Sequence, residues 1–300
     1  MPHHVLGDQP SRHPSAGLEE MPTCVPLAEL LGLLELERTE ADVFLGRHTA
    51  MSAQIDHVFG GLVAAQALVA AARTVPAERA VHALHAHFLR AGDHRVPLEY
   101  HVDRTRDGGA FSHREVTAHQ HDRVIATFSC SFTVPLEGPE HAASPPVVPG
   151  PDGLRPDHEV YAERPGVHPT ARAVDVVELR TVPGEPWELA LWMRAAGPVG
   201  DDPLLHAAVL TYATDMRVLQ PALRPHGVSL LDDVSSRVHP ATLDHTIWFH
   251  EQPRTDAWLL LTAESPWAAH GRGLVRGAVF DESGRLVAEV AQEALIRFRS

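Results

Sequence analysis

The stretch HAAVLTYATDMRVL, residues 206–219, decides how this chain folds. It contains no glycine or proline, and it is rich in Ala, Leu, Met and Tyr, a composition typical of a helix. Apolar residues lie on every side of its helical wheel, and from Pro203 to Met216 the only charged side chain is that of Asp215. A helix that is apolar on all sides is a buried helix. The sequence therefore predicts a buried helix that carries a single carboxylate.

A buried carboxylate is costly unless other groups hold it by hydrogen bonds. Asp215 must therefore have partners elsewhere in the fold. On the residues alone, two interpretations stay open: a capping or paired carboxylate with a structural role, and a catalytic carboxylate.

A second stretch, HVFGGLVAAQALVAAARTVP at residues 57–76, also predicts a helix that is apolar all round. A short helix and a strand are expected before it, in residues 26–49. Four strand-like runs separated by turn sequences follow it, at residues 80–91, 97–107, 110–120 and 123–135. The second half repeats this order, with lead-in strands at 174–182 and 187–197, the helix of Asp215, and runs at 235–251, 257–266, 271–281 and 285–299.

This internal repeat predicts an α+β fold of two similar units, each a long buried helix wrapped by a curved antiparallel sheet. We expect a disordered tail over residues 1–25, a first repeat over 26–134, a linker over 135–169 and a second repeat over 170–300. The linker is dense in Pro, Gly and Glu. The two sheets are expected to join edge to edge, which removes two exposed edges.

The two repeats can be aligned by their last strands, VIATFSCSF at 124–132 and LVAEVAQEA at 286–294. In this alignment Cys130 is equivalent to Gln292. The strands VHALHAHF and TLDHTIWF, at 81–88 and 242–249, align so that Val81 is equivalent to Thr242. Gln66 falls near the position of Asp215, in a helix whose register the alignment does not fix.

The composition restricts the partners of this chain. There are 39 acidic and 25 basic residues, a formal net charge of −14, which argues against nucleic acid and anionic membrane surfaces as partners. The first 22 residues lack the apolar core of a signal peptide, and the run from Val58 to Ala72 is too short to span a bilayer. Two cysteines do not make a disulfide framework. We therefore expect a cytoplasmic protein with no stable membrane insertion.

Twenty-two histidines raise the question of a metal site. Strand alternation places His85 and His87 on one face of the sheet and His82 on the other. A metal site would also need a carboxylate or cysteine nearby, and the sequence offers none. We expect neither a metal nor an organic cofactor.

The order of these motifs resembles that of the type II acyl-CoA thioesterases, which have a double hotdog fold. The resemblance rests on several long stretches in the same order and covers residues 26–297, with the linker matching least. In the first half these stretches are HVFGGLVAAQAL, VHALHAHFLRAGD, TRDGGAFSHREVTA and ATFSCSF. In the second half they are YATDMRVLQPALRPHGVSLL, ATLDHTIWFHE and the segment from 258 to 297.

The resemblance implies an Asp, a Thr and a Gln that orient one water molecule for attack on a thioester. Matched by motif, these are Asp215 of YATD, Thr242 of ATLDH and Gln292 of VAQEA. The chain departs from the family pattern at Leu62, where a Gln is expected. This difference is expected to affect how the substrate fits more than the chemical step. The resemblance also favours a homodimer or a larger homo-oligomer.

Thioester hydrolysis needs a base, an oriented water and donors for the oxyanion. Asp215 would be the base, and Thr242 and Gln292 can each donate and accept hydrogen bonds to that water. The backbone N–H groups of Phe59, Gly60 and Gly61, at the start of the first apolar helix, are the candidate oxyanion donors. His82 is a further candidate through its strand.

Other functions remain as alternatives. The chain could hydrolyse acyl groups carried by a carrier protein, or bind acyl-CoA without catalysis. A hotdog dehydratase would need a His and a carboxylate across the cleft between helix and sheet, and the sequence shows no such pair. A serine hydrolase is disfavoured because the chain has no G-x-S-x-G motif. Because Val81 and Cys130 stand where the second repeat has Thr242 and Gln292, we expect one working site per chain.

Overall fold

The computed structural model describes residues 26–48, 57–163, 176–230 and 238–298. The first half holds α1 (Leu27–Leu33), β1 (Glu37–Glu40), β2 (Val43–Gly46), α2 (Gly60–Ala72), β3 (Ala80–Phe88), β4 (Leu98–Asp107), β5 (Phe111–Gln120) and β6 (Arg123–Thr133). A 3-10 turn η1 (Pro151–Gly153) and α3 (Asp157–Ala162) follow. The second half holds β7 (Val177–Val182), β8 (Glu188–Ala195), α4 (Pro203–Arg217), α5 (Gln220–Leu223), η3 (Arg224–His226), β9 (Val238–Thr242), β10 (Asp244–Phe249), β11 (Leu259–Ala269), β12 (Arg272–Asp281) and β13 (Leu286–Phe298).

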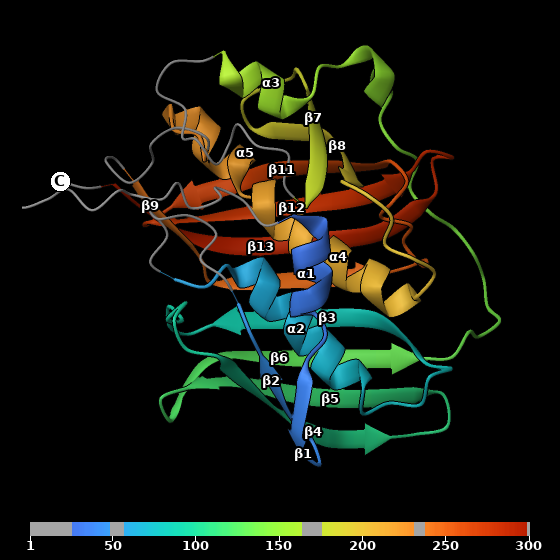
Figure 1. Ribbon diagram of the computed structural model, residues 1–300. Helices are drawn as coiled ribbons and strands as arrows, with labels where there is room; N and C mark the ends of the chain where they lie inside the picture. The colour runs from blue at the N-terminus through green and yellow to red at the C-terminus, as the bar shows by residue number, and fades with distance from the viewer. Residues whose placement is uncertain (1–25, 49–56, 164–175, 231–237, 299–300) are drawn as a thin grey trace, which may run out of the picture.

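The strands of both halves form one antiparallel sheet (Figure 1). Within the described residues its order is β1-β2-β4-β5-β6-β3-β10-β13-β12-β11-β8-β7, and β9 pairs with β13. The halves meet where β3 pairs with β10, with Leu84 opposite Ile247. This is the edge-to-edge junction that the sequence predicts, and the hydrogen bonds between these strands satisfy both edges.

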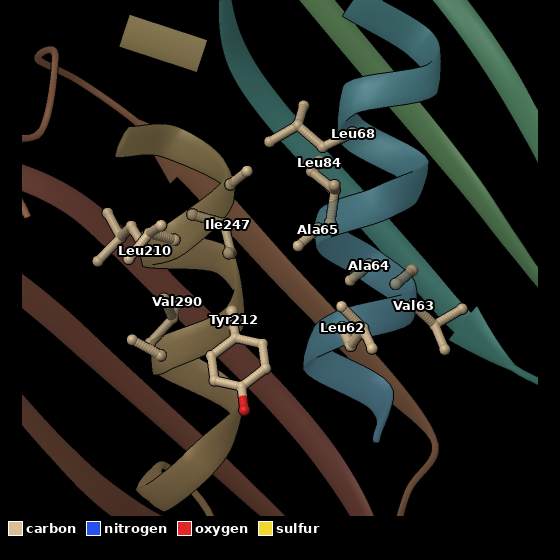
Figure 2. Close-up of a cluster of buried hydrophobic side chains, with 14 of the residues drawn as sticks. Leu62, Val63, Ala64, Ala65, Leu68, Leu84, Leu210, Tyr212, Ile247 and Val290 are labelled. Carbon is tan, nitrogen blue, oxygen red and sulfur yellow. The ribbon is translucent and has the colours of Figure 1, made fainter. Parts of the chain in front are cut away.

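Both long helices, α2 and α4, lie side by side on the same face of this sheet (Figures 1 and 2). Eleven of the residues in α2, from Gly61 to Ala71, are buried without interruption, as are those of α4 from His206 to Asp215. Small side chains in α2 allow the two helices to approach closely, and Leu62 and Ala65 face the helix that carries Tyr212 (Figure 2). The prediction of two helices buried on all sides is confirmed.

Two of the predicted strands are divided in the structure. Residues 37–46 form the hairpin β1–β2 rather than one strand, and all four residues of β1 are exposed. The run at 235–251 divides at Leu243 into β9 and β10. Its residues 235–237 lie outside the described ranges.

The predicted linker is packed against the second half as far as it is described, up to residue 163. The indole of Trp192 donates to the carbonyl of Pro149 at 2.8 Å, and Arg180 donates to the carbonyl of Pro151 at 2.8 Å. A second apolar cluster, separate from the main core, lies beneath it, and Val148 and Leu154 pack against that cluster. The cluster consists of Val182, Trp192, Trp258, Leu260 and Phe280.

No helix in the described ranges is long and apolar enough to cross a bilayer. The predicted tail over residues 1–25 lies outside those ranges. Cys130 is buried with a free thiol, and burial raises the pKa of that thiol.

Candidate active site

Asp215 lies near the carboxyl end of α4, and only 8% of its surface is exposed. Its Oδ2 atom faces the start of α2. A Cβ atom placed on Gly60 would lie 3.0 Å from this oxygen. The carboxylate therefore lies against a backbone that only glycine allows to come so near.

Two polar side chains from the sheet form a chain of hydrogen bonds that ends at Asp215. The hydroxyl of Thr242 donates to Asp215 Oδ1 at 3.2 Å, and the amide Nε2 of Gln292 donates to Thr242 Oγ1 at 2.9 Å. Thr242 ends β9, and Gln292 lies on the inner face of β13 with 1% exposure. The structure thus brings together the three residues selected from the sequence, and their catalytic roles remain a prediction.

The position of Thr242 depends on an irregularity in the strand. Leu243 separates β9 from β10, and its N–H donates to the carbonyl of Glu293 at 2.9 Å. The Asp244 side chain accepts from the N–H of Glu293 at 2.9 Å. This bulge adds a residue, so Thr242 and His245 point to the same face although they are three residues apart. Asp244 supports the bulge and does not contact Asp215 in the described hydrogen bonds.

The segment Phe59–Gly61 forms the start of α2 beside Asp215. Phe59 is the N-cap residue, and no side chain caps this helix end. The ring of Phe59 packs edge-on against Tyr212 of α4, with ring centroids 5.0 Å apart. A Cβ on Gly61 would lie 2.8 Å from the Tyr212 carbonyl oxygen. The two helices therefore fit so closely that this helix start stays next to the carboxylate, with its first N–H groups available.

His82 does not lie with these residues. A bulge between Val81 and Ala83 turns it to the outer face of the sheet, where its Nε2 lies 2.8 Å from Ser131 Oγ. The prediction that His82 and His85 point to opposite faces is wrong, because strand alternation fails at a bulge. His82 therefore lies on the face of the sheet that is turned away from the helices.

Gln66 does not take the place of Asp215 in the first repeat. Its amide donates to the carbonyls of Leu33 and Arg47, each at 2.7 Å, and accepts from the Tyr100 hydroxyl at 2.8 Å. These bonds join α2 to the segments around α1 and β2. Gln66 is thus a structural residue.

Sequence reasoning missed His245, which continues the hydrogen-bonded chain beyond Gln292. Its Nδ1 lies 2.8 Å from Gln292 Oε1, and its Nε2 lies 3.1 Å from Thr214 Oγ1. Burial lowers the pKa of His245, and the nearby Asp215 carboxylate opposes that shift. The available signal was the ATLDH motif itself, in which His245 lies three residues after Thr242, but only the bulge makes the two side chains neighbours.

The registers of the two repeats agree with the alignment made from the sequence. Val81 pairs with Phe132 in the first repeat, and Thr242 pairs with Ala294 in the second. The bulge follows directly after Val81 in β3 and after Thr242 at the end of β9.

The same spacing makes Leu84 and Cys130, which form a cross-strand pair, the equivalents of His245 and Gln292. The first repeat thus has Val81, Leu84 and Cys130 in place of the three polar side chains.

Among the described residues, no group of three or more His, Cys, Asp or Glu side chains is placed to hold a metal ion.

Comparison with known proteins identifies the family of this chain. The family model for the N-terminal domain of acyl-CoA thioesterases matches residues 48–133, and the model for their C-terminal domain matches residues 139–296. The chain belongs to the acyl-CoA thioesterase family. It is therefore a thioester hydrolase that acts on acyl-CoA.

Individual relatives cover nearly the whole chain. Acyl-coenzyme A thioesterase 8 from Rattus norvegicus is 38% identical over 88% of this chain and 88% of its own length. The crystal structure of acyl-CoA thioesterase II TesB2 from Mycobacterium marinum is 35% identical, covers 90% of this chain and 98% of its own, and superposes with a TM-score of 0.74.

A protein with a hot dog fold from Alicyclobacillus acidocaldarius shares 22% identity and a TM-score of 0.70, over 90% of this chain and 98% of its own. That likeness concerns the fold alone.

Proposed function

We propose that this thioesterase, a double hotdog of two fused repeats, hydrolyses fatty acyl-CoA to the free fatty acid and coenzyme A by direct attack of water. Asp215 is the base, and Thr242 and Gln292 orient the reacting groups. The observation that carries this proposal is the chain of hydrogen bonds from Gln292 through Thr242 to Asp215, at 2.9 and 3.2 Å, beside the open start of α2.

The two carboxylate oxygens of Asp215 have different surroundings, which supports different roles for them. Oδ1 accepts from Thr242, while Oδ2 faces the start of α2 at Gly60. Oδ2 is therefore the oxygen that takes the proton of the attacking water. Orienting the reactants can lower a barrier by about 7–11 kcal/mol in the best intramolecular cases.

The start of α2 suits the developing oxyanion. When water attacks the thioester carbon, the carbonyl oxygen becomes negative and can accept from the N–H groups of Gly60 and Gly61. Collapse of the tetrahedral intermediate breaks the C–S bond, and the coenzyme A thiolate takes up the proton that Asp215 accepted from the water, which restores the carboxylate. In this arrangement the first repeat supplies the backbone donors and the second supplies the base.

The proposal is tested by thiol release from decanoyl-CoA, followed with a thiol reagent, for the wild type and Asp215→Ala. We expect rapid release by the wild type and almost none by the variant. Release that is unchanged in Asp215→Ala would remove the base from the mechanism. Binding of decanoyl-CoA without thiol release by the wild type would favour the alternative of a non-catalytic acyl-CoA-binding protein.

The second alternative concerns the carrier of the acyl group. Comparing kcat/KM for decanoyl-CoA with that for the same acyl group on a carrier protein distinguishes the two thioesterase activities. The formal charge of −14 disfavours an acidic carrier protein through like-charge repulsion.

We also propose a cytoplasmic homodimer or larger homo-oligomer. The sheet ends in two edge strands, β1 and β7, within the described residues, and such edges favour pairing with another chain. Light scattering coupled to size exclusion would give the mass in solution, and a monomer at micromolar concentration would contradict this proposal.

A further inference from the structure

His245 is a fully buried histidine whose two ring nitrogens both have partners. Nδ1 lies 2.8 Å from Gln292 Oε1, and Nε2 lies 3.1 Å from Thr214 Oγ1. Thr214 lies on α4, one residue before Asp215, and its hydroxyl also lies 3.2 Å from the carbonyl of Thr211. The imidazole therefore connects the sheet residue Gln292 to the helix that carries the candidate base.

The protonation state of this imidazole limits how donors and acceptors can be arranged along the chain of hydrogen bonds from His245 to Asp215. Burial lowers the pKa of His245, so the ring is neutral near pH 7, although the Asp215 carboxylate opposes the shift. A neutral imidazole has one N–H donor and one acceptor nitrogen. Only two arrangements of these hydrogen bonds give each ring nitrogen and the Gln292 amide a suitable partner. They differ in which His245 nitrogen carries the proton.

In the first arrangement every donor points toward the carboxylate. His245 Nδ1–H donates to Gln292 Oε1, Gln292 Nε2–H donates to Thr242 Oγ1, and the Thr242 hydroxyl donates to Asp215 Oδ1. The Thr214 hydroxyl turns its single proton from the Thr211 carbonyl to His245 Nε2, 3.1 Å away. Each atom in the chain has a partner of the correct type.

In the second arrangement the proton is on Nε2, which donates to Thr214, and the Thr214 hydroxyl donates to the Thr211 carbonyl at 3.2 Å. The Gln292 amide must then turn over to donate to Nδ1, so that its oxygen takes the Thr242 proton. A lone pair of Thr242 Oγ1 would face Asp215 Oδ1 at 3.2 Å, and an ionised carboxylate has no proton to offer. The first arrangement is therefore the one compatible with a carboxylate that can act as a base.

We propose that His245 is a positioning residue for thioester hydrolysis, which fixes the Gln292 amide so that Thr242 donates its proton to Asp215. This rests on the proposed function and adds a residue to it. The Leu243 bulge brings His245 to the same face as Thr242.

In the first repeat, the apolar pair Leu84 and Cys130 takes the place of His245 and Gln292. The repeat without the catalytic set thus also lacks its support.

The test compares His245→Asn with His245→Leu. The Asn amide nitrogen can take the place of Nδ1 and donate to Gln292, whereas Leu fills a similar volume without a donor. We expect kcat to fall by about 10–100-fold in His245→Leu with KM nearly unchanged, and by less than about threefold in His245→Asn. His85→Leu is the matched control, because His85 lies on the outer face and contacts Thr246 at 3.2 Å. It should keep the wild-type kcat.

A spectroscopic measurement on the wild type avoids variants that fail to fold. In protein with 15N-labelled histidine, the His245 resonances should report a neutral ring protonated on Nδ1. A ring protonated on Nε2, or wild-type kcat in a folded His245→Leu, would overturn the inference. If Asp215→Ala also has full activity, the proposed function fails as well. If Asp215→Ala is inactive and His245→Leu is not, only this inference fails.

Discussion

The two repeats share one architecture and differ at the inner face of the sheet. At equivalent positions the first repeat has Val81, Leu84 and Cys130, and the second has Thr242, His245 and Gln292. The first set packs in or against the apolar core, whereas the second forms one hydrogen-bonded chain that reaches Asp215. The same backbone geometry thus serves packing in one half and a polar site in the other.

The starts of the two long helices also differ: the start of α4 is capped by a side chain, and the start of α2 is not. In α4 the side chain of Asp202 accepts from the N–H of Leu204 at 2.9 Å, so a carboxylate already caps this end. In α2 no side chain caps the start at Phe59, and Asp215 of the other repeat lies beside it. In the proposed mechanism the first half therefore supplies the backbone donors and the second half supplies the side chains.

The outer face of the sheet also differs between the halves. In the second half it carries the cluster around Trp192 and Trp258, against which the segment from Val148 to Leu154 packs. In the first half it carries histidines such as His82 and His85, and burial lowers the pKa of both. His82 and His85, which raised the question of a metal in the sequence, thus lie on a surface away from the candidate site.

The largest expected effect is that of Asp215→Asn. The amide can still accept from Thr242 but cannot take a proton from water, so kcat should fall by about 10³-fold. An acyl-CoA chain-length panel should show the same loss at every length, because the base is common to all substrates. A loss confined to some lengths would mean that Asp215 shapes the acyl pocket instead. The melting temperature of the variant checks that it is folded.

Exchanging equivalent residues tests the asymmetry between the repeats directly. Thr242→Ala removes the donor to Asp215 Oδ1 and leaves Gln292 Nε2 without its acceptor, so kcat should fall by about 10²-fold. The matched variant Val81→Thr adds a hydroxyl at the equivalent position and should leave kcat near the wild-type value. Steady-state kinetics on both variants measures this. A strong change of kcat in a folded Val81→Thr variant would contradict one working site per chain.

Gly60→Ala tests the open helix start. Its Cβ would lie 3.0 Å from Asp215 Oδ2 and 3.3 Å from the Phe88 ring, so the carboxylate must shift by a few tenths of an ångström. We expect kcat to fall by about tenfold, since small displacements of reacting groups are costly. Gly32→Ala in α1 is the control, because a Cβ there meets nothing within 4 Å. It should leave kcat unchanged and raise the free energy of unfolding by about 0.5–1 kcal/mol.

The smallest effect concerns the pH dependence of stability. Because burial lowers the pKa of His245, the unfolded chain takes up a proton at this residue near pH 6.5 while the folded protein does not. The free energy of unfolding should therefore fall as the pH decreases below 6.5. In His245→Asn this decrease in the free energy of unfolding should be shallower, since the imidazole that takes up a proton on unfolding is gone. Urea unfolding at pH 7.5 and 5.5 measures the difference, and identical slopes would mean that the ring is protonated in the folded state.

Much of the fold follows from hydrophobic patterning in the sequence. The helices of Gln66 and Asp215 are apolar on all sides, which requires a layer that covers them, and alternating runs after each helix supply the strands. The repeat also predicted the junction between the halves. The bulges at His82 and Leu243 could not be predicted, because a run of alternating residues contains no local signal for one unpaired position.

The candidate site was also predicted in part from the sequence. Asp215, Thr242 and Gln292 were selected from motifs that resemble those of a family, and the structure places them in contact. His245 was not selected, because strand alternation gives no reason to place it beside Thr242, three residues earlier. His82 was included because its strand was expected near the site, and the structure turns it to the outer face. In the structure the two bulges decide where both side chains point.

The sequence by itself determined that a carboxylate would be buried in an apolar helix and that the chain would consist of two similar halves. Those properties depend on which residues are apolar and at what spacing, which is information local to each segment. Only the tertiary structure decided which groups surround the carboxylate. The start of α2 lies about 150 residues before Asp215 and Gln292 lies about 80 after it, and only packing of the two helices on one continuous sheet brings them together.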